Sequence, residues 1–388
     1  MTTLSRLRSS FLSAGLSGWL LVMSPRLLRA SGDVSYKYED YGEDGGRIAV
    51  KTQSALINQD LTPDLHLKLQ GVIDAIAGAT PNGQPAPAGS DQVVLTQMHD
   101  RRKAWEADLS SQFPGINVTA GFANSRESDY VSNGWSLNTL TGFNEKNTTL
   151  LAGLAGTDDS VKVFYQAPWA KKRTFQMIVG VSQLLDPRTA VTANVSWERV
   201  TGYLSDPYKL VQKTVEVAPG ISLPFTYGEN RPTDRDQWTL YLALNHAFPE
   251  LHAAIEASYR YYHDTFGTGA HTVEVSWLQR LGPRVLLRPN LRFHSQTAAD
   301  FYHYNLDRTS IVPSATGPAP QGPFYSSDYR LSKLDAYTYG LQLVWNVARQ
   351  VQLDVAVSQY DMRGRDGVTP QSAYPRARIV TAGVRFSW

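Results

Sequence analysis

Eight histidines are the side chains in this sequence that are best suited to binding a metal ion or moving a proton. None of them forms an H-x-x-x-H pair and no H-E-x-x-H motif occurs, so there is no zinc-protease signature. His263 and His271 flank one turn with Asp264 beside it, which leaves a loop metal site as an alternative. His294 precedes Ser295, but adjacent residues of a strand face opposite sides, and no G-x-S-x-G motif is present. We therefore expect no enzyme, with a membrane hydrolase as the weaker alternative.

The chain of 388 residues contains no cysteine. This excludes a disulfide framework, a thiolate metal site, a cysteine nucleophile and covalent attachment of c-type haem. Lysine and arginine number 37 against 35 aspartate and glutamate residues, so the net charge of +2 provides no basic field for nucleic acid. The sequence also has no phosphate-binding P-loop and no dinucleotide-binding fingerprint. We therefore expect neither a cofactor nor a nucleic-acid partner.

Carboxylates recur beside arginine and aromatic residues in four segments, 202–209, 231–235, 298–302 and 325–330. The candidate site residues in these segments are Asp206, Arg231, Asp234, Asp300, Asp328 and Arg330. One hypothesis is a cluster of Asp–Arg pairs between loops, as part of a folded cap. A second is a calcium site, because Ca²⁺ takes several carboxylate oxygens as ligands. Hydrogen-bonded turns explain Asp and Pro in such segments better than a metal does, so we expect no metal ion.

The elements that position these residues are expected to be β-strands, because apolar and polar residues alternate along most of the chain. Residues 238–248, 251–261 and 337–347 show this period of two, which places apolar side chains on one face. A soluble β-sandwich shows the same alternation, so the turns decide between the two folds. Short turns are expected at 61–64, 114–115, 144–147, 186–188, 249–250, 282–284 and 349–350, and the longest connections near 79–102, 204–235 and 303–333. Short turns at one end and long loops at the other are typical of an outer-membrane barrel.

The number of strands is consistent with a closed barrel. Seven short turns join fourteen strands, residues 376–388 supply one more, and residues 33–41 supply the first, with a tight outer loop at 43–46. The sequence therefore predicts an all-β fold, a transmembrane antiparallel β-barrel of about sixteen strands. An even number places both chain ends on the periplasmic side, with short periplasmic turns and long extracellular loops. Residues 79–90, rich in Pro, Gly and Ala, are expected to form an exposed loop.

The first thirty residues differ from the rest of the chain. Arg6 and Arg8 precede an apolar run at 11–23, and Ala30 precedes two small residues. This pattern is typical of a cleaved signal peptide, because the apolar run is too short to span a bilayer. We expect residues 1–30 to be the signal peptide and 31–388 to be the barrel, exported to the outer membrane of a Gram-negative bacterium. An uncleaved amphipathic N-terminal helix is the alternative.

Charged residues of the strands are expected to face the lumen, since an arginine facing lipid at the bilayer midplane costs ~2–4 kcal/mol. The candidates are Lys68, Asp74, Glu198, Glu256, Arg260, Glu274, Arg288, Arg292 and His294, and Lys51 is expected to face inward as well. Neighbouring antiparallel strands bring such side chains within reach of one another, which predicts a ladder of acidic and basic groups. This ladder either orients polar solutes in a water-filled lumen or stiffens and partly fills the barrel. The sequence leaves both interpretations open.

The C-terminal segment ends on aromatic residues. Val380, Ala382, Val384, Phe386 and Trp388 share one face of the last expected strand. A terminal strand of this kind resembles the signal that the bacterial barrel-assembly machinery recognises, so Phe386 and Trp388 are the candidate assembly signal. The expected partners are therefore outer-membrane lipid and that machinery.

The loop segments described above, together with SRESDY at 125–130 and RYYHD at 260–264, closely resemble a bacterial family named domain-of-unknown-function family 3570. The resemblance covers nearly the whole chain after residue 30. It implies an outer-membrane β-barrel without an assigned activity. Relatives that stand beside small lipoproteins, thioredoxin-like proteins and flavin transferases imply a periplasmic redox or lipoprotein partner, although no cofactor motif occurs in this chain.

Three functions follow from these observations. The first is a porin-like conduit for small polar solutes or ions. The second is a structural sheath or scaffold for a periplasmic or extracellular redox partner, and the third and weakest is a barrel enzyme. The content of the lumen separates the first two, because a conduit needs a water path whereas a sheath needs a partner or loops that fill it.

Overall fold

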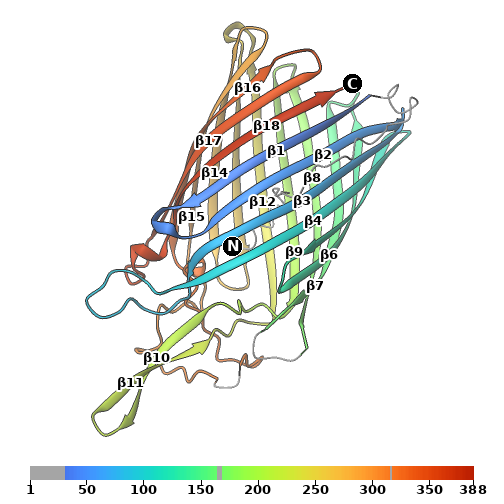
Figure 1. The fold of residues 1–388 in the computed structure, drawn as a ribbon. Coiled ribbons are helices and arrows are strands. Elements are labelled where there is room, and N and C mark those ends of the chain that lie inside the picture. Colours follow the sequence, from blue (N-terminus) through green and yellow to red (C-terminus); the bar gives the residue numbers. More distant parts are fainter. Residues whose placement is uncertain (1–30, 164–167, 315–316) are drawn as a thin grey trace.

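Sixteen β-strands close into one antiparallel barrel in the computed structural model, which describes residues 31–163, 168–314 and 317–388 (Figure 1). The barrel strands are β1 (Gly32–Glu43), β2 (Ala49–Thr62), β3 (Leu65–Pro81), β4 (Leu95–Phe113), β5 (Ile116–Arg126), β6 (Tyr130–Phe143), β7 (Thr148–Val161), β8 (Ala170–Asp186), β9 (Thr189–Gly202), β12 (Asp234–Phe248), β13 (Ala253–Asp264), β14 (Gly269–Leu281), β15 (Val285–Gln296), β16 (Leu334–Asn346), β17 (Val351–Gly364) and β18 (Arg376–Ser387). Strands β10 (Leu210–Ala218) and β11 (Ile221–Gly228) form a separate hairpin, and single 3-10 turns lie at η2 (Asp44–Gly46), η3 (Pro249–Leu251), η4 (Tyr329–Leu331) and η5 (Gln371–Ala373). Among the residues that the structure describes, no helix is long and apolar enough to cross a membrane. The expected signal peptide, residues 1–30, lies outside the described residues.

The first and last strands pair with each other and close the barrel. β1 pairs with β2 on one side and with β18 on the other, where Asp33 lies opposite Ser387. The backbone of Gly32 exchanges hydrogen bonds of 3.3 and 3.0 Å with that of Trp388. Glycine is needed at position 32, because a Cβ atom there would come within 2.7 Å of the Trp388 ring. Closure gives every strand two neighbours, which a strand inside a bilayer requires.

The predicted asymmetry of the connections is confirmed. All the expected short turns join consecutive strands at one end of the barrel, where β1 begins and β18 ends (Figure 1). We call this the short-turn end and the opposite one the long-loop end. The expected long connection at 79–102 is wrong in extent, because β3 continues to its residue 81 and β4 begins at residue 95. Residues 79–81 pair in register with 95–97, so pairing to a neighbouring strand overrides a composition that favours a loop.

Apolar side chains cover the outside of the barrel. Trp105, Phe122 and Leu291 lie on different strands, and each is at least half exposed. Trp197 and Trp238 lie side by side on β9 and β12, with ring centres 6.3 Å apart. An apolar exterior of this extent is stable against lipid and not against water, and aromatic rings are favoured at its borders. The chain is therefore a transmembrane β-barrel.

Most of the buried apolar side chains gather at the long-loop end rather than inside the barrel. Phe266 packs edge-on against Phe301, with ring centres 4.9 Å apart. Leu306 and Tyr325 pack on Val211 at the base of β10. We call the segments at this end the cap: residues 82–94, 203–233, 265–268, 297–314, 317–333 and 365–375. The β10–β11 hairpin is part of the cap and projects away from the barrel (Figure 1).

Candidate functional site

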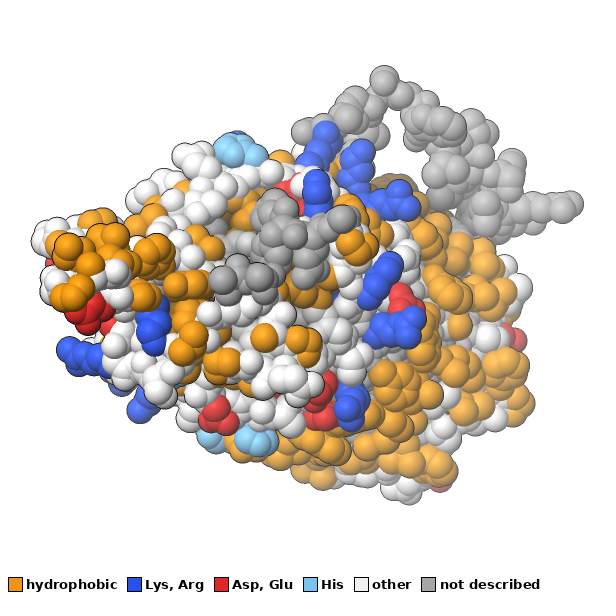
Figure 2. All heavy atoms as spheres, turned by 90° about the horizontal axis from the view of Figure 1, so that it is seen from below, with side chains coloured by type: hydrophobic (Ala, Val, Ile, Leu, Met, Phe, Trp, Pro, Cys, Tyr) orange, Lys and Arg blue, Asp and Glu red, His pale blue; other side chains and the backbone are white. Residues whose placement is uncertain are grey.

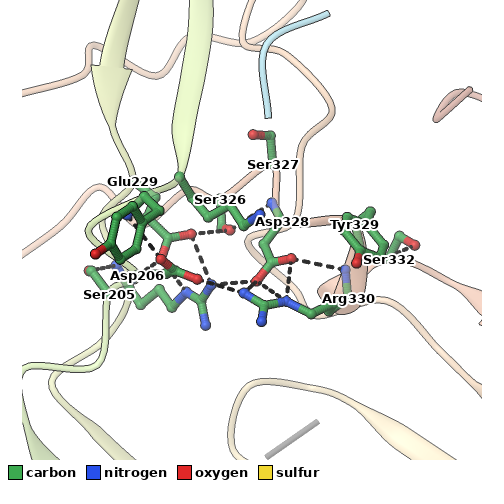
Figure 3. A network of polar contacts seen from close by, with 12 residues as sticks. Ser205, Asp206, Glu229, Ser326, Ser327, Asp328, Tyr329, Arg330 and Ser332 are labelled. Atoms are coloured by element: carbon green, nitrogen blue, oxygen red, sulfur yellow. Dashed lines mark hydrogen bonds and ion pairs between the residues drawn. The ribbon is translucent and has the colours of Figure 1, made fainter. Parts of the chain in front are cut away.

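A chain of alternating charges ties the two longest loops of the cap together (Figure 3). Arg231 contacts Glu229 at 2.6 Å and Asp328 at 2.9 Å. Arg330 contacts Asp328 and Asp206, both at 2.6 Å. The side chains of Glu229 and Asp328 are almost completely buried, with 0% and 2% exposed. These five residues therefore link the loop between β9 and β12 to the loop between β15 and β16.

Hydroxyl and backbone groups complete this network. Ser326 donates a hydrogen bond of 2.5 Å to Glu229, and the backbone amide of Asp206 donates to the same carboxylate. The backbone of Asn230 exchanges hydrogen bonds of 2.9 and 2.8 Å with that of Tyr325. A buried charge without partners is costly, so a network with this many partners favours one arrangement of both loops.

Lys209 links the cap to the barrel wall. Its Nζ donates a hydrogen bond to the carbonyl of Pro81 at the end of β3, and it lies 5.7 Å from the centre of the Tyr329 ring. The next residue, Leu210, accepts a hydrogen bond of 2.6 Å from the hydroxyl of Ser327. The loops of the cap are therefore held to one another and to a strand of the wall.

The charges of the network determine which of its carboxyl groups ionise. Burial alone would raise the pKa of Asp328, but Arg330, Lys209 and Arg231 outweigh burial and hold this pKa well below its ordinary value. Burial raises the pKa of Glu229 above its ordinary value, and Arg231 only partly opposes this shift. Asp328 therefore gives up its proton more readily than an ordinary aspartic acid, whereas Glu229 accepts a proton more readily than an ordinary glutamate.

Asp264 and Arg235 form a further buried ion pair where the cap meets β12 and β13. Asp264 also accepts hydrogen bonds from the hydroxyl of Tyr262 and from two backbone amides of the turn that follows it. His263 is exposed on the outward face, and His271 hydrogen-bonds a tyrosine hydroxyl on that face. The structure therefore does not assemble the alternative loop metal site, because alternating strand positions separate both histidines from the carboxylate.

Below the cap, the lumen faces of β3 to β9 surround a chamber of about 960 Å³. Nine acidic and five basic side chains line it. Small residues of β5, β6 and β7 leave room for it, among them Gly121, Ala123, Gly134, Ser136 and Ala155. At Gly121 a Cβ atom would lie 2.3 Å from the Asp108 carboxylate, so a larger residue would displace a charged group.

Asp100, Glu127 and Asp129 are a cluster of carboxylates in the wall of this chamber. One oxygen from each lies within 4.8 Å of the other two. Burial raises the pKa of Glu127 to about 7; Arg102 opposes this shift, and Asp100 and Asp129 add to it. Carboxylate oxygens at this spacing suit a hard cation such as Ca²⁺. The chamber therefore carries its least neutralised negative charge beside the loop between β5 and β6.

Ion pairs also join neighbouring strands of the lumen wall nearer the short-turn end. Lys68 contacts Glu106 at 2.9 Å and Asp108 at 2.7 Å, and Arg288 on the far wall contacts Glu256 at 2.6 Å. The side chains of Lys68, Arg288 and Glu256 are 39%, 36% and 42% exposed. Because these groups are turned inward and still accessible, they face space that water can fill rather than a packed interior.

The sequence matches a family model over residues 22–170 and 165–375, described as "Protein of unknown function (DUF3570)". The chain belongs to this family. A search of curated proteins gives no match. Among solved structures, a bacterial polysaccharide outer membrane secretin is similar at 10% identity and a TM-score of 0.47, over 92% of this chain and 98% of that one. OpdK of Pseudomonas aeruginosa, solved with vanillate, is similar at 10% identity and a TM-score of 0.45, over 93% and 100%.

The structure of this DUF3570 barrel turns the nine candidate lumen residues inward, but not Lys51. Asp74 contacts Arg102 at 3.2 Å, and Glu198 accepts a hydrogen bond from Gln237. Other members of the predicted set form one wall: Glu256 and Arg260 on β13, Glu274 on β14, and Arg288, Arg292 and His294 on β15. Glu274 lies opposite Arg292, and the His294 ring forms a hydrogen bond with the Thr272 hydroxyl. The expectation for Lys51 is wrong, because it lies on the outward face, opposite Asp40 of β1.

Of the predicted loop residues in this DUF3570 protein, four meet in the cap and two do not. Asp206, Arg231, Asp328 and Arg330 form the network above, whereas Asp234 is exposed at the start of β12 and Asp300 is exposed beside the turn at Gly267. In the predicted assembly signal, Phe386 lies in β18 and Trp388 directly follows its last residue, with ring centres 6.1 Å apart.

Sequence reasoning missed three groups of this site: Glu229, Lys209 and the carboxylates of the chamber. The spacing of the network residues along the sequence contained one pattern that could have predicted the ion pairs. Glu229 precedes Arg231 by two residues and Asp328 precedes Arg330 by two, so in extended chain each acid lies on the same side as its arginine. Nothing in the sequence distinguishes Lys209 from an exposed lysine, because its burial depends on a loop contact to β3.

Proposed function

We propose that the barrel is an outer-membrane conduit for small polar solutes or ions, with a preference for cations. Outer-membrane barrels carry short turns on the periplasmic side and long loops on the outer side. In this orientation the cap faces the cell exterior and the chamber lies directly below it. A cleaved signal peptide at residues 1–30 would deliver the chain to this membrane.

The observation that carries the proposal is the accessible, charged interior. Lys68 lies on the wall opposite Arg288 and Glu256, each of the three is three residues from the start of its strand at the short-turn end, and each keeps more than a third of its side chain exposed. A barrel filled by side chains would bury such groups, and burying them would require complete pairing. A wet lumen with charges on both walls supports passage of polar solutes.

The preference for cations is proposed from the chamber. Its nine acidic side chains exceed its five basic ones, and walls of low dielectric constant concentrate the resulting field. The cluster of Asp100, Glu127 and Asp129 contributes most, because ion pairs with lysines or arginines compensate five of the other six acidic groups: Glu106, Asp108, Asp159, Asp206 and Asp328. A cation entering from the cap side would pass this cluster first.

The test is single-channel recording from the refolded barrel, residues 31–388, in a planar bilayer under a KCl gradient. We expect discrete conductance steps and a reversal potential that shows K⁺ passing more easily than Cl⁻. The triple variant D100N/E127Q/D129N should lower the permeability ratio by about twofold or more, since it removes the field at the chamber wall. D234N, which removes an exposed carboxylate outside the chamber, is the matched control. A folded barrel that stays silent would contradict the conduit.

A structural scaffold for a redox or lipoprotein partner is the second candidate, and the β10–β11 hairpin favours it. Ile221, Leu223 and Phe225 share one face of the hairpin and are 55%, 47% and 42% exposed. An exposed apolar face on a projecting element suits contact with another protein. A silent barrel that co-purifies from native membranes with a flavin or haem protein would support the scaffold over the conduit.

A further inference from the structure

Basic side chains line the outward face of one wall at the long-loop end. We call them the basic belt: Arg101 and Lys103 on β4, Arg126 on β5, Lys171 and Arg173 on β8, and Arg199 on β9, all of them exposed. Figure 2 looks at this end and shows lysine and arginine side chains along the border between the cap and the apolar outer wall. The belt is separate from the chamber, because the alternate positions of the same strands face the lumen.

The faces follow from the register of the strands. Lys103 alternates with Arg102, which contacts the inward Asp74 at 3.2 Å, so Lys103 points outward. Lys171 alternates in the same way with Lys172, which lines the chamber. Lys171 also donates a hydrogen bond of 2.7 Å to Ser160 on the outward face of β7. The belt therefore faces whatever surrounds the barrel.

Two members of the belt lie directly opposite each other without a compensating acid. Lys103 of β4 pairs in register with Arg126 of β5. Like charges in this position repel each other and destabilise the sheet. In the described parts of the chain, no ion pair or side-chain hydrogen bond is assigned to either residue. This pair is stabilised if an anion from outside the protein lies between the two charges.

On the opposite wall, outward arginines at the long-loop end contact aspartates. On β17 and β18, Arg363 and Arg376 both lie near Asp361, at 2.6 and 3.9 Å. Arg365 contacts Asp335 at 2.8 Å. The acids of that wall compensate these arginines, and within the belt Asp158 and Asp236 contact Arg173 and Arg199 at 2.8 and 3.6 Å. The uncompensated pair of Lys103 and Arg126 is therefore a local feature and not a property of the whole rim.

The depth of the belt indicates which anion it meets. Trp105 is two residues from Lys103 towards the short-turn end, and Phe122 and Trp135 lie on the next strands at the same level as one another. These rings are 50%, 65% and 43% exposed. Aromatic side chains mark the border of the hydrocarbon layer, so basic groups just beyond them lie at the depth of the headgroups.

We propose that the basic belt binds phosphate groups of lipid headgroups in the leaflet at the long-loop end. A phosphate offers several oxygens, and the guanidinium of Arg126 donates to two of them while the ammonium of Lys103 neutralises the remaining charge. A lipid fits better than a soluble anion because the belt continues directly into the apolar wall, which takes up the acyl chains. This inference rests on the position of the belt in the membrane and does not depend on conduction.

The test is native mass spectrometry of the full barrel in detergent, titrated with diphosphorylated lipid A. We expect the wild-type barrel to retain the lipid, and K103Q/R126Q to bind it about tenfold more weakly through the loss of two charge-assisted contacts. K103R should bind as the wild type does, because it keeps the charge. R280Q/R284Q removes the same charge at the short-turn end and should leave lipid binding unchanged. Heat-modifiable migration on a gel verifies that each variant is folded.

Further titrations distinguish a lipid phosphate from a free phosphate ion as the ligand of the belt. Lipid A with its phosphates removed should bind far more weakly to the wild type, and added salt should weaken binding of the intact lipid because it screens exposed charges. Equal binding of the two lipids, or equal binding by folded K103Q/R126Q, would overturn the proposal. Inorganic phosphate that displaces the lipid at equal molar concentration would also overturn it, since the belt would then recognise a free anion.

Discussion

Arg231 is the residue on which the closed arrangement of the cap depends most. Its guanidinium lies between two carboxylates, Glu229 and Asp328, and only 12% of its side chain is exposed. An arginine in this place compensates two buried charges at once, whereas Arg330 has one buried partner and one partly exposed partner, Asp206. Removing one partner of a buried pair costs more than the pair contributes, because the other charge stays uncompensated.

Arg231→Ala should therefore destabilise the cap locally by about 3–5 kcal/mol. We expect faster hydrogen exchange and faster proteolysis at residues 203–233 and 317–333, with the barrel strands unchanged. Arg173→Ala is the control, because the exposed pair of Arg173 and Asp158 contributes only ~0–1 kcal/mol. If the cap of the Arg231 variant were cleaved no faster than that of the control, the network would not hold the cap.

Glu127 should make the proposed cation preference depend on pH. Burial raises its pKa to about 7, so it is mostly charged above this pH and mostly neutral below it. Lowering the pH from about 8 to about 6 should reduce the permeability ratio of K⁺ to Cl⁻, because protonation removes one negative charge from the chamber. In Glu127→Gln this step should disappear, and a step of unchanged size would assign it to another group.

At the scale of elements, closure depends on the contact between β1 and β18. The two strands pair along their whole length, and Trp388 adds backbone hydrogen bonds to Gly32 beyond the last strand residue. Its ring lies against Gly32, where no side chain would fit. The C-terminal aromatic residue thus contributes to the seam of the barrel as well as being the predicted assembly signal.

Deletion of Trp388 should reduce the amount of barrel assembled in the outer membrane, because both the seam contact and the terminal aromatic residue are lost. Trp388→Phe keeps an aromatic terminus and should assemble as the wild type does. The measurement is the heat-modifiable band in the membrane fraction of cells that express each variant. An undiminished band after the deletion would show that assembly does not require this residue.

Element positions were predictable where alternation and turn chemistry agree. The segment before the turn at 249–250 alternates apolar and polar residues, and β12 ends there as expected. The composition of residues 79–81 favours a loop, yet they pair with 95–97 in the longest hairpin of the barrel. Composition describes the preference of the isolated chain, whereas a neighbouring strand supplies hydrogen bonds that override it.

At the scale of the whole molecule, the barrel has one accessible interior and one apolar exterior, and the two are separated by single-residue alternation. Glu256 points into the lumen and contacts Arg288, whereas Val273 on the neighbouring strand is 44% exposed on the outer wall. A shift of one residue in register would exchange these environments. This makes the assignment of faces testable at individual positions.

A cysteine at position 256 should react with a membrane-impermeant maleimide, because water in the lumen reaches it. A cysteine at position 273 should resist that reagent and, when carrying a fluorophore, be quenched by lipid-soluble quenchers. The chain has no native cysteine, so each label reports one position. Lipid-side quenching at position 256 would contradict the assignment of faces, and with it the proposed conduit.

The closed antiparallel barrel, the short turns and inward charges such as Lys68 and Arg288 are predictable from the amino-acid pattern alone. These features depend on a period of two and on the cost of charge in lipid, both of which act on each strand separately. The folded chain was needed to find the outward position of Lys51, the burial of Glu229 and Lys209, and the chamber around Asp100 and its neighbours. Such features depend on which loops and strands meet at the long-loop end, and those contacts join residues far apart in the chain.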